Sequence, residues 1–81
     1  PDERSDVFSV GAILYEMLTA KRPSVRGAAL PSATNTHVDA ALDEVVMRAV
    51  APNPAKRHAR AAELAAALRR IEEALVARGS G

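Results

Sequence analysis

The chain has 81 residues, 48% of them hydrophobic, with 11 lysines and arginines against 10 aspartates and glutamates. A chain of this length forms one small domain that buries only about 60% of its extended surface. With no cysteine, near-zero net charge and one Phe and one Tyr as its aromatic residues, it excludes disulfides and thiolate metal sites and argues against a nucleic-acid partner.

The first predicted element is a helix from about Ser5 to Thr19, which is apolar over more than half of its circumference. Asp2 or Ser5 is its expected N-cap, and Asp6 falls in the first turn, where a carboxylate suits the positive end of the helix dipole. Gly11 inside the helix costs roughly 1 kcal/mol relative to alanine, so we expect another backbone to approach closely there.

Two further helices follow a loop rich in Pro, Ser, Thr and Asn at residues 20–37. Apolar spacing predicts a helix over 39–51, which Pro52 ends, with Asp43, Glu44 and Arg48 on its exposed face. A third helix is predicted over 60–78, with a narrow apolar stripe at Leu64, Leu68, Ile71 and Leu75. Residues 79–81 are expected to be a frayed tail or linker.

The second and third helices present only narrow apolar stripes, so they cannot cover the first helix completely. We therefore expect a strip near Val7, Ile13, Leu14 or Leu18 to face water, and the chain to self-associate through it. No apolar run reaches the roughly 18 residues of a membrane span, and the first residues do not resemble a secretory signal. The chain is expected to be soluble and cytoplasmic, without a membrane partner.

Several motifs resemble the C-terminal lobe of bacterial serine/threonine protein kinase catalytic domains. They are Asp2-Glu3-Arg4-Ser5-Asp6, Phe8-Ser9-x-Gly11, Asn53-Pro54-Ala55-Lys56-Arg57 and Ala62-Glu63-Leu64. The resemblance implies an all-α fold with three main helices, in which residues 1–78 form part of the kinase lobe. Because the chain begins at Pro1 and not at Met, we expect it to be a fragment. The span 24–37 is too short for the extra helix that kinases place there.

The resemblance also implies roles for individual residues, none of them catalytic. Asp6 would accept hydrogen bonds from the backbone of the catalytic loop, and Arg57 would pair with a glutamate upstream of this chain. Ile13 and Met17 would belong to the apolar stack beneath the adenine of ATP, and Glu16 could face a basic substrate, although a solvated helix acid is the alternative. Since both partners lie outside the chain, we expect alanine at Asp6 or Arg57 to be tolerated here.

The groups that perform phosphoryl transfer are absent from these 81 residues. The chain has no Gly-rich phosphate loop, strand lysine, His-Arg-Asp loop or Asp-Phe-Gly metal ligand. We therefore expect no catalytic residue, no metal site and no bound cofactor, whereas the intact parent would use ATP and Mg²⁺ on a protein substrate. The partner of this chain would be the remainder of the kinase domain. The alternative is a non-catalytic, kinase-derived helical interaction module.

Overall fold

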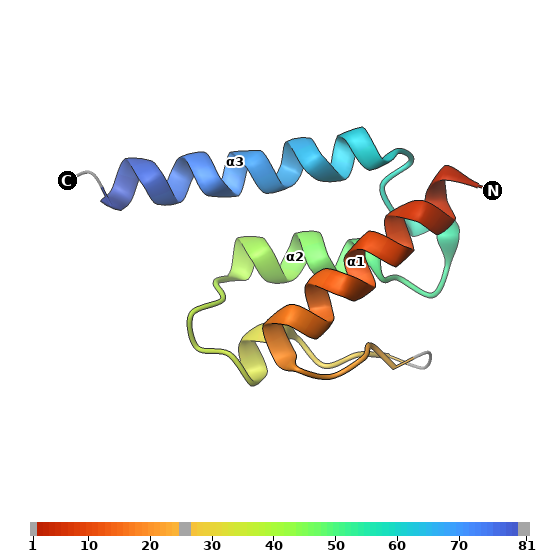
Figure 1. Ribbon diagram of the computed structural model, residues 1–81, viewed down its shortest axis with the longest axis horizontal. Helices are drawn as coiled ribbons and strands as arrows, with labels where there is room; N and C mark the ends of the chain where they lie inside the picture. Colours follow the sequence, from red (N-terminus) through yellow and green to blue (C-terminus); the bar gives the residue numbers. More distant parts are fainter. Residues whose placement is uncertain (1, 25–26, 80–81) are drawn as a thin grey trace.

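The computed structural model describes residues 2–24 and 27–79, which form three α-helices and two short 3₁₀ turns (Figure 1). In chain order these are α1 (Glu3–Thr19), η1 (Pro31–Ala33), α2 (Ala40–Ala49), η2 (Pro54–Lys56) and α3 (Ala61–Gly79). The described residues contain no strand, so the predicted all-α class with three main helices is confirmed. α2 and α3 run side by side in opposite directions, and α1 crosses α2.

The ends of the helices differ by a residue or two from the predicted ranges. Asp2 is the N-cap of α1, with its side chain accepting a hydrogen bond from the Arg4 backbone N–H (3.0 Å), so the helix begins two residues before Ser5. Asp39 caps α2 in the same way through the Leu42 N–H (3.0 Å). The tail was predicted over residues 79–81, but α3 includes Gly79, and residues 80 and 81 lie outside the described residues.

The centre of the core takes one residue from each helix. Val7 of α1 and Ala49 of α2 are fully buried, and Leu64 of α3 is 1% exposed; Val45 and Leu68 pack against them. The prediction that Val7 is a candidate for the exposed strip is therefore wrong. Val7, Gly11 and Tyr15 are the buried residues of α1, and their four-residue spacing places them on one face of the helix.

Gly11 marks the place where α1 crosses α2. A Cβ atom at this position would lie 2.6 Å from the Cβ of Ala49 and 3.1 Å from Cγ1 of Val50. Carbon atoms in contact normally lie about 3.5 to 4.0 Å apart, so any side chain at Gly11 would force the two helices apart. The close backbone approach predicted from the sequence is confirmed.

The segment between α1 and α2 is held to the helices by polar side chains. Asp43 of α2 accepts hydrogen bonds from the backbone N–H of Ser32 (2.9 Å) and from its hydroxyl. Asp43 is only 7% exposed, so the prediction that it lies on the solvated face of α2 is wrong. Asn35 donates to the carbonyl of Leu18 (3.0 Å), and the Tyr15 hydroxyl donates to the carbonyl of Ala29 (2.7 Å). These bonds satisfy backbone groups that regular secondary structure would otherwise pair.

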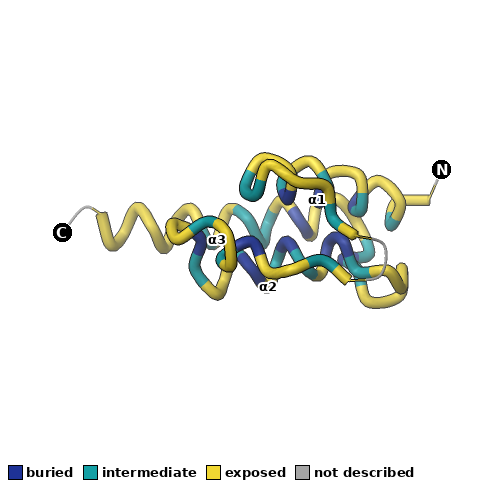
Figure 2. Tube along the Cα trace, turned by 90° about the horizontal axis from the view of Figure 1, so that it is seen from below, coloured by how far each residue is buried: buried dark blue, intermediate teal, exposed yellow. Residues whose placement is uncertain are grey.

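The C-terminal part of α3 extends past the other two helices, and its residues are exposed from Glu72 to Gly79 (Figures 1 and 2). Its apolar residues Leu75 and Val76 are 52% and 62% exposed. No helix within residues 2–24 and 27–79 is long and apolar enough to cross a membrane.

Candidate functional site

Arg57 is the most heavily engaged of the residues predicted from the sequence. It follows η2, whose N-cap Asn53 accepts a hydrogen bond from the Ala55 backbone N–H (3.0 Å). The guanidinium donates through Nε to the carbonyl of Ala51 (2.7 Å), with longer bonds from Nη1 to Arg4 and from Nη2 to Pro52 (both 3.3 Å). Its carbon lies 4.7 Å from the centre of the Phe8 ring, within the range of a cation–π contact.

These contacts alter what is expected of Arg57 in the chain itself. The sequence predicted that alanine would be tolerated because the carboxylate partner lies elsewhere. Arg57 instead joins the segment after α2 to the first two turns of α1, through the carbonyl of Arg4 and the ring of Phe8. Removing it would leave three backbone acceptors without this donor, so we now expect a loss of stability.

Asp6 lies near the same end of α1 as the Arg4 carbonyl that Arg57 contacts. It is exposed, and its carboxylate makes no hydrogen bond to the described residues. The structure therefore leaves this carboxylate free to accept hydrogen bonds from another chain segment. It brings Arg57 to Phe8 and Arg4, but among the described residues it shows no hydrogen bond or ion pair between Arg57 and Asp6.

Three apolar residues of α1 form an exposed surface, which we name the α1 strip: Val10, Ile13 and Met17, which are 41%, 59% and 76% exposed. They recur at helical spacing and so lie on one face. The prediction that Ile13 faces water is confirmed, whereas Leu14 and Leu18 are half-buried. Glu16 is exposed and lies beside the strip. None of these residues is among those that line the hollow between α2 and α3 or the two smaller hollows along α3.

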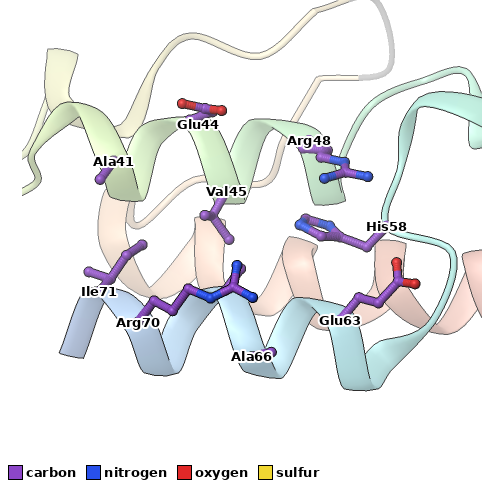
Figure 3. A pocket seen from close by; sticks show the side chains of 10 residues that line it. Ala41, Glu44, Val45, Arg48, His58, Glu63, Ala66, Arg70 and Ile71 are labelled. Carbon is purple, nitrogen blue, oxygen red and sulfur yellow. The ribbon is translucent and has the colours of Figure 1, made fainter. Parts of the chain in front are cut away.

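A hollow of about 450 Å³ lies between α2 and α3, and sequence analysis did not predict it (Figure 3). His58, from the segment between the two helices, lines it together with Arg48 of α2 and Glu63 and Arg70 of α3. His58 is only 3% exposed, and its Nδ1 atom is buried without a hydrogen-bond partner among the described residues. No motif in the sequence marks His58, so sequence reasoning had no signal for this hollow.

Burial lowers the pKa of His58 below its usual value of 6.5, because the charged imidazolium loses its hydration. The positive charge of Arg48 acts in the same direction, and the negative charge of Glu63 opposes both. His58 is therefore neutral near pH 7. Separately, the described residues contain no group of three or more His, Asp or Glu side chains that could hold a metal ion.

Comparison with known proteins relates the chain to bacterial kinases. No protein-family model matches it. The serine/threonine-protein kinase PknB of Mycolicibacterium smegmatis is 38% identical over 85 residues, covering 89% of this chain and 14% of that protein. PknB of Mycobacterium tuberculosis is 39% identical over 83 residues, covering 86% of the chain and 13% of the protein. PknL of M. tuberculosis is 39% identical over 87 residues, covering 91% of the chain and 22% of the protein.

The chain is thus homologous to a small region of bacterial serine/threonine protein kinases. It spans less than a quarter of the length of these curated relatives.

Proposed function

We propose that these 81 residues are part of the C-terminal lobe of a serine/threonine protein kinase catalytic domain. The parent transfers the γ-phosphoryl group of ATP to Ser or Thr hydroxyls of a protein substrate in the cytoplasm, and this segment supports its active site. The observation that carries the proposal is the 38% identity to PknB over 89% of the chain.

The geometry of α1 supports the same proposal. One face of the helix is buried against α2 and α3, and the opposite α1 strip is exposed although it is apolar. In a catalytic domain Ile13 and Met17 would be covered by the apolar stack beneath the adenine. Asp6, whose carboxylate is free here, would hold the catalytic loop, and Glu16 could meet a basic substrate residue.

The segment itself performs no chemistry under this proposal. Phosphoryl transfer depends on metal ligands and phosphate donors held in position, and the sequence contains none of the corresponding motifs. ATP and Mg²⁺ would be bound by other parts of the parent. Titration calorimetry of the 81-residue chain with Mg-ATP should show no saturable binding, and micromolar affinity would contradict this assignment.

A chimeric kinase tests the proposal directly. The matching segment of M. smegmatis PknB is replaced by these 81 residues, and autophosphorylation is measured on the purified chimera. We expect the chimera to retain activity, and to lose most of it with Asp6→Asn, because the catalytic loop would lose an acceptor. Glu73→Gln, on the exposed face of α3, is the matched control and should leave activity unchanged.

A folded chimera without activity would contradict the proposed supporting role. Circular dichroism separates this result from simple misfolding. Equal activity in the Asp6→Asn and Glu73→Gln chimeras would remove the role assigned to Asp6 while leaving the segment's place in the kinase intact.

We further propose that the isolated chain self-associates through the α1 strip. Two apolar side chains left in water forfeit about 3 to 6 kcal/mol of burial, a large share of the stability of a domain of this size. Sedimentation over a concentration series should show oligomers that Ile13→Glu disperses. A monomer at all concentrations would contradict this proposal. A stable partner that binds the strip, together with an inactive but folded chimera, would favour the interaction module instead.

A further inference from the structure

The hollow between α2 and α3 combines nitrogen-bearing side chains with a floor of methyl groups. Arg48, His58 and Arg70 supply the nitrogen atoms, and Val45, Ala66 and Ile71 contribute apolar surface. Its volume of about 450 Å³ falls within the range of small-molecule sites. A second, mostly apolar hollow of about 210 Å³ adjoins it along the helices and shares Ala41, Arg70 and Ile71.

Neither arginine at this hollow forms an ion pair among the described residues, and Arg48 donates through Nε to the carbonyl of Lys56 (3.3 Å). The ion pair recorded among the described residues, Arg60 with Glu3 at 4.0 Å, involves neither of them. Glu63 also lines the hollow; one of its oxygens accepts the Ala59 backbone N–H (3.1 Å), and its carboxylate forms no ion pair with either arginine among the described residues. The carboxylate of Glu44 lies away from Arg70 and His58 in Figure 3.

His58 supplies the second, independent observation. His58 lines the hollow and is only 3% exposed. Its Nδ1 atom has no hydrogen-bond partner among the described residues. In Figure 3 the imidazole and the guanidinium of Arg70 point toward each other from the two sides of the hollow. A buried ring nitrogen without a partner destabilises the chain, and a ligand that hydrogen-bonds there would relieve this.

We propose that this hollow binds a small organic carboxylate whose carboxyl group lies between Arg70, Arg48 and His58 and whose short hydrocarbon portion covers the alanine-lined floor. Arginine suits this role because its planar fork matches both oxygens of a carboxylate. The apolar floor, which continues into the second hollow, favours a ligand with several methylene groups over a bare inorganic anion. The site lies between α2 and α3, away from the α1 strip, and does not depend on the proposed kinase function.

Hexanoate is a suitable probe, with acetate and inorganic phosphate as comparisons. Heteronuclear NMR of the 81-residue chain should show saturable shifts at the His58 ring and at the Ala66 methyl group, with a Kd of about 1 mM for a ligand of this size. Acetate should bind roughly tenfold or more weakly, because it lacks the methylene groups that cover the floor. Phosphate should cause no saturable shift at Ala66.

Two neighbouring substitutions on α3 provide the matched test. Arg70→Gln should weaken hexanoate binding about tenfold or more, because it removes a charged donor from the site. Arg69→Gln should leave binding unchanged, since Arg69 lines a different surface of the same helix. Both side chains are exposed, so neither change should affect folding.

Several results would overturn the proposal. They are the absence of saturable shifts up to about 10 mM hexanoate, equal weakening by the two substitutions, phosphate binding as tightly as hexanoate, and shifts confined to the α1 strip.

Discussion

Replacing Gly11 with alanine tests how closely α1 approaches α2. The new Cβ would lie 2.6 Å from Cβ of Ala49 and 3.2 Å from its carbonyl carbon, so the helices must separate by about 1 Å to reach normal contact. Overpacking of this kind costs about 1 to 3 kcal/mol, and the higher helix propensity of alanine returns about 1 kcal/mol. Because a backbone atom is part of the clash, we expect a net loss of about 1 to 2 kcal/mol.

Urea and thermal unfolding measure this loss directly. For a domain of this size the midpoint should fall by about 4 to 16 °C. Gly79→Ala is the matched control, because a Cβ at this second helical glycine meets nothing within 4 Å. In an Ala49→Gly background, Gly11→Ala should cost about 1 kcal/mol less, since the 2.6 Å contact is gone. An unchanged or raised midpoint for Gly11→Ala as the single substitution in the 81-residue chain would refute the reasoning.

Three further changes probe other parts of the structure. Ala20→Gly should stabilise the chain by about 0.5 to 1 kcal/mol in thermal melts, because Ala20 ends α1 with a φ of 61° that glycine adopts without strain; a lower midpoint would contradict this. Arg57→Ala should destabilise it by about 1 to 3 kcal/mol through the lost carbonyl bonds and the Phe8 contact, whereas Lys56→Ala, at an exposed side chain, should not. Stability should fall as the pH drops below 6.5, because the unfolded chain then binds a proton that His58, with its lowered pKa, does not bind in the folded state. This loss of stability should end once the pH is below the folded-state pKa of His58. It should be absent in His58→Gln and still present in the control His37→Gln, because His37 is exposed.

The fold was largely predictable because local signals agree with the tertiary contacts. Apolar spacing, capping aspartates and prolines located all three helices to within two residues of their observed ends. Asp43 was misplaced because helical periodicity cannot show that the preceding loop folds back over α2. The hydroxyl and N–H of Ser32 draw this carboxylate inward, and that pairing joins residues eleven apart in the chain.

The candidate sites were less predictable for a different reason. Motif spacing singled out Arg57, but its contacts to Arg4, Ala51 and Pro52 depend on where the segment after α2 turns. His58 carried no motif at all. Its burial results from the packing of α3 against α2, which no local pattern encodes. Sequence can therefore identify residues whose role is tied to a recurring pattern, and it misses those whose chemistry arises only from tertiary burial.

The two faces of α1 connect the fold to the proposed function. The buried face, with Val7, Gly11 and Tyr15, allows α2 to approach so closely that no Cβ atom fits between Gly11 and Ala49. The α1 strip lies on another face and stays largely in water, with Val10, Ile13 and Met17 41%, 59% and 76% exposed. A helix held rigidly from one side while it presents apolar residues on the other is suited to support a further structural layer. This is the physical reason for preferring a scaffolding role over a site of chemistry along α1.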